Sequence, residues 1–236
     1  MLIIHFQQFI TSQIKLANMK QLLFVLVFLS IMTACEQANV YFESPQPADG
    51  KVEQKFDKKY IGKYKSGSYE GVFLEVQKQS ITSEYFWKEK YLSSEIDSIA
   101  AFEWKGESLY FQGELQKYVR QEDTIEIEKH SKEVIFDLKH DLLKSKNNTY
   151  FLNRQDGDFW EVQKLILDSK GNLILSELSD VEEMDKLSQV TKVDSVLHND
   201  SSETVDYYVV RPTDSEFDDI VNGTFFTIED VYIRIE

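Results

Sequence analysis

The sequence holds one cysteine in 236 residues, together with only 9 glycines and 3 prolines. A single cysteine excludes an intrachain disulfide and a multi-thiolate zinc site, so stability must come from a hydrophobic core. Little glycine and proline, beside 16 Phe, 12 Tyr and 3 Trp, excludes a largely disordered or collagen-like chain. The composition therefore predicts an ordered, aromatic-rich globular protein.

Basic residues are scarce relative to acids: 26 Lys and Arg stand against 41 Asp and Glu, a formal net charge of −15. Nucleic-acid phosphates and polybasic membrane patches both demand clusters of Lys and Arg, which this balance does not favour. We therefore expect no nucleic-acid partner, and we expect any protein partner to be basic or neutral.

No apolar run reaches the roughly 20 residues that span a bilayer. The longest, residues 22–29, follows Lys20 and leads to the small residue Ala34 and then to the single cysteine, Cys35. A positive residue, a short apolar core and a small residue before a cleavage point predict a secretory signal over residues 1–34. Residues 1–18 precede a complete signal that starts at Met19, which indicates a start assigned too far upstream or an unusually long leader.

Residues 19–36 resemble the leader of bacterial lipoproteins, with Met32, Thr33, Ala34 and Cys35 standing as the lipobox. The resemblance implies a diacylglycerol on the Cys35 thiol, cleavage before it, and acylation of the freed amine, for example with palmitate. Each buried CH₂ adds about 0.8 kcal/mol, and more than one acyl chain gives stable anchoring. The alternative for Cys35 is a buried thiol.

Lipidation would place the protein outside the cytosol, at the cell envelope, with its membrane contact at Cys35. The residue after the cysteine is Glu36 and not aspartate, which favours the outer membrane over the inner in cells that have both. Removal of residues 1–34 takes away two lysines and no acids, leaving a net charge of −17.

Residues 35–59 are expected to form a lipidated tether. They contain two of the three prolines, in residues 43–47, and proline favours extended, semi-rigid backbone. Tyr41 and Phe42 are expected either at the bilayer interface or packed back on the domain. Residues 60–236 are long enough for one domain with a sizeable core.

Period-two alternation of apolar residues predicts a chain of β-strands after the tether. The predicted strands are residues 61–64, 72–76, 81–92, 109–112, 118–120, 124–128, 134–138, 149–152, 159–167, 173–178, 205–209 and 224–236. Asn147-Asn148 and Asp156-Gly157 are turn signals, and the connections after them are too short for parallel crossovers. The last strand changes its apolar face, which predicts a bulge near Asp230.

Two helices are predicted in the C-terminal third, where Asp180 and Thr213 each precede a glutamate three residues later, as in a capping box. Gly223 is the expected end of the second helix. The fold class is therefore mainly β: an antiparallel meander, closed as a barrel or stacked as a sandwich, with two short capped helices.

This organisation resembles uncharacterised small envelope lipoproteins with a β-rich domain. The strand entry Gly62-Lys63-Tyr64 also resembles that of lipocalin-like barrels. The latter resemblance covers three residues and carries over no ligand site.

No motif assigns a catalytic residue, a cofactor or a metal ligand. Outside the leader the histidines are His130, His140 and His198, and they lack zinc spacing. Residues 153–161 resemble a calcium loop, but the position that needs an oxygen ligand holds Leu152, so a hairpin turn is preferred. P-loop, dinucleotide-glycine and G-x-S-x-G motifs are absent from the sequence.

The aromatic residues allow two readings. Trp87, Trp104 and Trp160, with Tyr85, Phe86 and Phe159 beside them, could line a sugar or lipid site. Aromatic residues at strand spacing are more often core residues, and we expect that role here.

Three functions remain after these exclusions. The first is a non-catalytic structural or binding module at the envelope, and the second is an inhibitor or immunity-type lipoprotein that masks a basic partner. The third is a hydrolase with two facing carboxylates, for which Glu103/Glu107 and Asp218/Asp219 are sequence-adjacent candidates.

Overall fold

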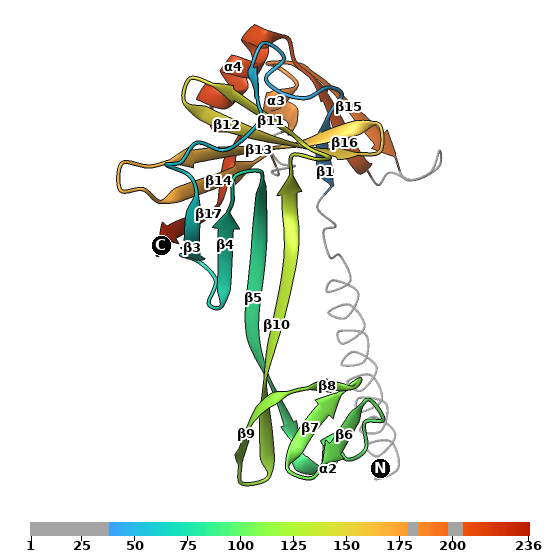
Figure 1. The fold of residues 1–236 in the computed structure, drawn as a ribbon. Helices are drawn as coiled ribbons and strands as arrows, with labels where there is room; N and C mark the ends of the chain where they lie inside the picture. The colour runs from blue at the N-terminus through green and yellow to red at the C-terminus, as the bar shows by residue number, and fades with distance from the viewer. Residues whose placement is uncertain (1–37, 179–183, 198–204) are drawn as a thin grey trace, which may run out of the picture. The chain divides into compact units, whose positions relative to one another are not determined.

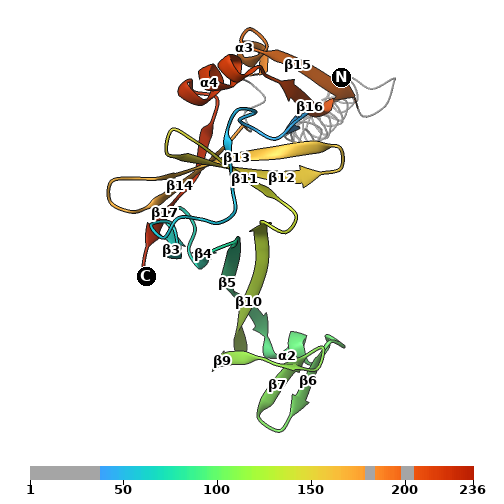
Figure 2. The same ribbon diagram turned by 45° about the horizontal axis from the view of Figure 1, so that its top comes forward.

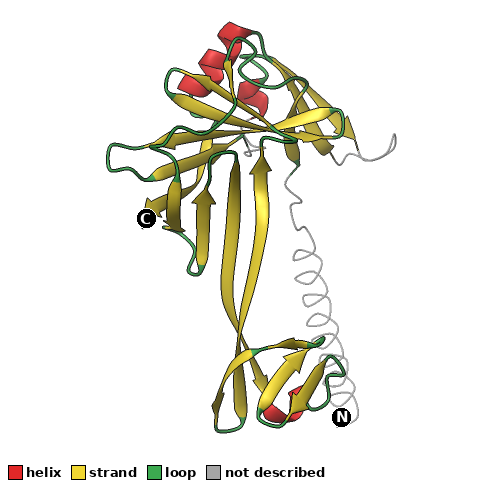
Figure 3. Ribbon diagram, in the orientation of Figure 1, coloured by secondary structure: helices red, strands yellow, loops and turns green. Residues whose placement is uncertain are grey.

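The structure, a computed structural model, describes residues 38–178, 184–197 and 205–236. Within these ranges the chain forms a 14-stranded sheet, a 3-stranded sheet and three short helices (Figures 1 and 3). Cys35, the predicted leader and His198 lie outside the described residues. The mainly β prediction is confirmed.

The described strands and helices follow one another along the chain. They are β1 (Asn39–Phe42), β2 (Lys51–Glu53), β3 (Gly62–Ser66), β4 (Val72–Val76), β5 (Ser80–Leu92), α2 (Ser93–Ile96), β6 (Phe102–Lys105), β7 (Ser108–Phe111), β8 (Glu114–Leu115), β9 (Lys117–Gln121), β10 (Thr124–Asp137), β11 (Leu142–Lys146), β12 (Thr149–Asp156), β13 (Phe159–Leu167), β14 (Leu173–Glu177), α3 (Met184–Leu187), β15 (Lys192–Leu197), β16 (Val205–Arg211), α4 (Asp214–Asn222) and β17 (Thr227–Arg234).

The large sheet follows the order β15-β16-β1-β13-β14-β17-β3-β4-β5-β10-β9, with β12, β11 and β2 branching from β13. The order is not that of a simple meander, because β17 enters between β14 and β3 and β1 enters between β16 and β13. Every pair is antiparallel except β1 with β16, which is parallel. Among the described strands β15 and β9 do not pair with each other, so no closed barrel is formed.

The turn signals predicted the local connections correctly. Asn147 and Asn148 both have positive φ, 52° and 63°, between β11 and β12, and Gly157 has φ 58° between β12 and β13. The pairing of β14 with β17 shifts by one residue between its contacts at Asp230 and Ile228. The predicted antiparallel order of β12, β13 and β14 and the predicted bulge are therefore confirmed.

The capping box of α4 is also confirmed. Thr213 Oγ1 accepts a hydrogen bond from the Glu216 amide, and the Glu216 carboxylate accepts one from the Thr213 amide at 2.8 Å. Phe217 and Ile220 are buried, and the helix ends before Gly223.

The prediction of two helices was incomplete. Only the second half of the first predicted helix, α3, lies in the described residues, since residues 179–183 are outside them. A third helix, α2, follows β5; it has four residues and one buried apolar side chain, Ile96, which is too short a pattern to detect in a sequence.

Residues 38–59 are part of the folded unit that extends from Ala38 to Glu236. β1 joins the large sheet, β2 pairs with β11, and Phe42 and Phe56 are buried in the core. The expected tether does not extend past Ala38, because two large aromatic side chains from this segment are removed from water. Of the two places expected for Tyr41 and Phe42, the structure has the packing on the domain.

Three clusters of buried side chains support the fold. The first, around Tyr64 and Phe136, contains side chains of β3, β4 and β5 and of β11 to β14. The second, around Phe42 and Phe217, contains side chains of α3 and α4 and of the strands β1, β12, β13 and β16. The third, around Ile125 and Leu109, joins the far ends of β5 and β10 to α2 and β7.

β5 and β10 pair residue for residue between the first and the third clusters (Figures 1 and 2). β4 pairs with β5 only as far as Tyr85, and β9 pairs with β10 only as far as Glu128. The pairs Phe86↔His130 and Trp87↔Lys129 thus lie in a two-stranded part of the sheet, beside which no further described strand pairs. This part of the molecule holds the candidate site.

Candidate functional site

Three consecutive aromatic residues in the middle of β5 are exposed to solvent. Tyr85, Phe86 and Trp87 keep 39%, 38% and 43% of their surfaces accessible. We call them the aromatic stretch. Burial of each ring would stabilise the protein by about 1.5–3 kcal/mol, so their exposure calls for an explanation.

The aromatic stretch presents rings on both faces of the sheet, because successive side chains in a strand point to opposite sides. Tyr85 lies opposite Ser131 on β10 and opposite Val72 on β4, so these three share one face. Phe86 lies opposite His130, and the two rings stack at a centroid distance of 4.4 Å. We refer to these as the Tyr85 face and the Phe86 face.

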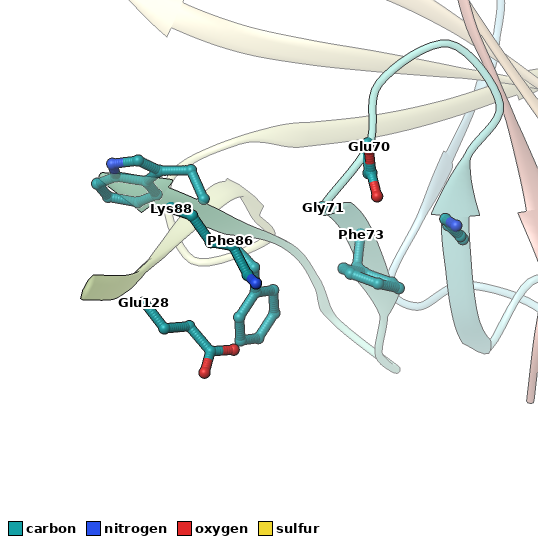
Figure 4. Close-up of a pocket in the computed structure, with 8 residues that line it drawn as sticks. Glu70, Gly71, Phe73, Phe86, Lys88 and Glu128 are labelled. Carbon is teal, nitrogen blue, oxygen red and sulfur yellow. The ribbon is translucent and has the colours of Figure 1, made fainter. Parts of the chain in front are cut away.

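A groove of about 660 Å³ lies on the Phe86 face (Figure 4). Phe73 and Phe86 form its apolar part, with their ring centroids 5.8 Å apart, edge to face. Glu128 and Lys88 come from the paired strands and Glu70 from the β3–β4 turn. The walls therefore carry charges of both signs.

A second groove, of about 450 Å³, lies on the Tyr85 face. Tyr85 and Trp87 from β5 and Ser131 and Glu133 from β10 line it, and Glu70 from the β3–β4 turn stands at its edge. Its charged lining is entirely acidic. We call it the acidic groove.

A third groove, of about 790 Å³, continues along the hairpin toward β7, β8 and β9. Here Trp87 Nε1 and the Tyr91 hydroxyl both donate to the Glu89 carboxylate, and the Trp87 bond measures 2.9 Å. These bonds hold the pKa of Glu89 below its usual value, the Tyr91 bond most strongly. The Trp87 ring is thereby oriented from within its own strand.

The β3–β4 turn that carries Glu70 is fixed by buried groups. Ser66 Oγ donates to the Asp230 carboxylate and accepts the amides of Ser68 and Tyr69 at 3.1 and 2.8 Å. Ser66 and Asp230 are 4% and 2% exposed, so water does not compete for these bonds. The bulge of β17 thus helps to set the position of one wall of the grooves.

Gly71 ends the same turn and touches the aromatic stretch directly. Its φ is +78°, and its carbonyl accepts the Phe86 amide at 2.8 Å. A Cβ on Gly71 would lie 2.0 Å from the Phe86 carbonyl oxygen. The turn can approach β5 this closely only because residue 71 has no side chain.

The lysines around the acidic groove are already engaged elsewhere. Lys132 pairs with Glu84, and this bond raises the pKa of Lys132. Lys129 places its ammonium 4.2 Å from the centroid of the Phe111 ring.

Lys88 pairs with Glu126 at 2.7 Å, which raises the pKa of Lys88. By contrast, neither Glu70 nor Glu133 forms an ion pair with any described residue. Neither carboxylate of the acidic groove is therefore held in an ion pair, although the charge of Glu70 contributes to the raised pKa of Lys88.

The residues considered for catalysis from the sequence do not line the grooves described above. Glu103 pairs with Lys105 and Asp218 with Lys146, and neither acid lines the grooves described above. His140 follows β10 in an exposed turn. Among the described residues, no group of three or more His, Cys, Asp or Glu side chains is arranged to hold a metal ion.

The expectation that the aromatic residues are core residues is met in part for Trp104 and Trp160, which are half-buried. They pack against the third and second clusters respectively. It is wrong for Tyr85, Phe86 and Trp87. Phe159 is half-buried in a group of rings with Tyr41 and Tyr207.

Sequence reasoning did not single out Glu70 or Glu133. The available signal was the segment 129–133, whose residues are all polar although apolar alternation flanks it on both sides. A strand that is polar on both faces indicates that nothing covers either face.

No helix in the described part of the chain has the length and hydropathy to cross a membrane. The chain matches no protein-family model, no curated protein and no solved structure.

Proposed function

We propose that this protein is a non-catalytic binding protein of the bacterial cell envelope, anchored by lipid at Cys35, that holds a partner against the aromatic stretch of β5. One observation carries the binding role: the consecutive residues Tyr85, Phe86 and Trp87 are exposed where the pairing with β4 ends and the sheet becomes two-stranded, with grooves on both faces. Aromatic side chains bring large contact area at low entropic cost. The envelope location rests on the lipobox resemblance of residues 32–35.

A photo-reactive amino acid at Tyr85 tests the binding role in intact cells. We expect a discrete, saturable cross-linked product, because the partner covers this ring. The same amino acid at Val119 on β9, which is 54% exposed and outside the grooves, provides the control and is expected to give none. Identical products at both positions, or none at position 85, would contradict the proposal.

The Cys35→Ser variant tests the anchor separately. We expect it to lose incorporation of labelled palmitate and to move from the membrane fraction to the soluble fraction, because the acyl chains are the proposed hold on the bilayer. Mass spectrometry of the natural protein should find a lipidated N-terminal cysteine. Unchanged membrane association of the variant would rule out this anchor.

The hydrolase alternative requires a different kind of site. It requires two carboxyl groups that face each other across a cleft. Glu70 and Glu133, the acids of the acidic groove, lie beside aromatic rings and a strand edge that pairs with no described strand. This arrangement is suited to binding an extended polypeptide. The binding role is therefore the function that this geometry supports best.

A further inference from the structure

The uncovered part of β10 offers backbone groups as well as side chains. From Lys129 to Val134 its outer edge pairs with no described strand, since β9 pairs only with residues 124–128. The register shift between Val134 and Phe136 interrupts the strand beyond this point. An edge of this kind is a template on which an extended peptide can add a strand.

On the Tyr85 face of this edge, the side chains that line the acidic groove favour a positively charged ligand. Ser131 and Glu133 point to the Tyr85 face, where the acidic groove also contains Glu70 and the rings of Tyr85 and Trp87. A cation over an aromatic face is stabilised by about 0.5–2 kcal/mol, and nearby carboxylates add charge-assisted hydrogen bonds. No basic side chain lines this groove.

The same face of the hairpin already holds one cation in this manner. Lys129, opposite Trp87, lies over the rings of Phe111 and Phe102, at 4.2 and 5.7 Å from their centroids. The rings around the acidic groove have no such occupant within the described chain.

We infer that the partner is an extended basic peptide segment, which pairs with the β10 edge from Lys129 to Val134 and places an arginine or lysine side chain in the acidic groove. The acidic excess of the chain, −15 overall, would attract such a segment at long range. This inference rests on the proposed binding function and adds the chemistry of the partner to it.

The test uses a short, blocked, labelled peptide of alternating arginine and threonine, with binding followed by fluorescence anisotropy. Two matched peptides carry citrulline in place of arginine, which removes the charge, or N-methylated backbone amides, which remove the donors for strand pairing. We expect the arginine peptide to bind at least about tenfold more tightly than either, and added salt to weaken it.

The double variant Glu70→Gln/Glu133→Gln should raise the Kd of the arginine peptide about tenfold and leave that of the citrulline peptide unchanged. The double variant Glu107→Gln/Glu122→Gln is the matched control. It neutralises two exposed acids of turns at the far end of the hairpin and should not change either Kd. Circular dichroism and thermal unfolding establish that both variants fold.

Equal affinity for arginine and citrulline peptides, or an unchanged Kd in Glu70→Gln/Glu133→Gln, would overturn the inference. The proposed function can survive that result, because cross-linking at position 85 does not depend on the charge of the partner. Absence of cross-linking together with tight, charge-dependent peptide binding would refute the function in cells while leaving the peptide chemistry intact.

Discussion

Replacing Gly71 by alanine is expected to lower the free energy of unfolding by about 3 kcal/mol. Two costs add up at this position. Alanine at φ +78° is strained, and its Cβ would meet the Phe86 carbonyl oxygen at 2.0 Å. Because that oxygen belongs to a paired strand, the turn must move away and the 2.8 Å bond from the Phe86 amide to the Gly71 carbonyl is weakened.

Gly106→Ala is the matched control. Gly106 also has positive φ, +64°, but a Cβ there meets nothing within 4 Å. We expect this variant to lower the free energy of unfolding by only about 1 kcal/mol, the cost of placing alanine at positive φ. Urea unfolding curves of the two variants measure the difference, and equal losses would show that the contact with Phe86 is unimportant.

Gly71→Ala should also weaken peptide binding beyond its effect on stability. The turn that moves carries Glu70, one of the two acids of the acidic groove. Binding measured well below the unfolding temperature should therefore show a raised Kd for the arginine peptide, whereas Gly106→Ala leaves it unchanged. An unaltered Kd in Gly71→Ala would mean that Glu70 does not contact the ligand.

Local signals in the sequence predicted local structure well, because the forces involved act within a few residues. Asn147-Asn148 and Asp156-Gly157 form the turns that their conformational freedom allows, and Thr213 caps α4 as its spacing indicates. The strand order could not be predicted in the same way. β17 pairs with β3, which is far from it in the sequence. The alternation of apolar residues in either strand does not indicate which strand it pairs with.

The β10 part of the candidate site was missed for a related reason, whereas Tyr85, Phe86 and Trp87 were named as a possible ligand site but expected in the core. The sequence predicted strands at 124–128 and 134–138 but not between them, since residues 129–133 have no apolar alternation. The structure has one strand there, β10, because backbone pairing with β5 continues where the side chains lose their cover. Period-two alternation arises where one face of a strand is buried and the other is exposed. The pattern is therefore weakest in a strand that is exposed on both faces, such as the part of β10 that borders the candidate site.

Asn153→Ala is expected to cost about 3 kcal/mol of unfolding free energy, the second large effect. Asn153 is fully buried, and its side chain holds the loop before β2. Its Oδ1 accepts the Gln46 amide, and its Nδ2 donates to the carbonyls of Gln46 and Phe151 at 2.8 and 3.1 Å. Truncation leaves these buried groups without partners and opens a cavity.

Lys144 holds the same loop by a second route, so loss of Asn153 should loosen the loop without releasing it. Its ammonium donates to the carbonyls of Pro45, Pro47 and Ala48 at 3.2, 2.7 and 3.3 Å. Burial lowers the pKa of Lys144. We therefore expect Asn153→Ala to increase amide exchange in residues 44–50 more than in β5 or β10.

Asn153→Asp separates hydrogen bonding from cavity formation, because it keeps the shape and removes the donors. We expect a loss of stability at neutral pH at least as large as that of Asn153→Ala, since the ionised carboxylate accepts bonds only and is buried. The loss should shrink in acid, where the protonated carboxyl regains one donor. Asn39→Ala, at an exposed residue whose side chain has one 3.3 Å bond to Tyr41, is the control and should change stability by less than about 0.5 kcal/mol. If Asn153→Asp were as stable as the natural protein at neutral pH, the loop would be held by Lys144 and by the packing of Phe42 and Phe56 alone.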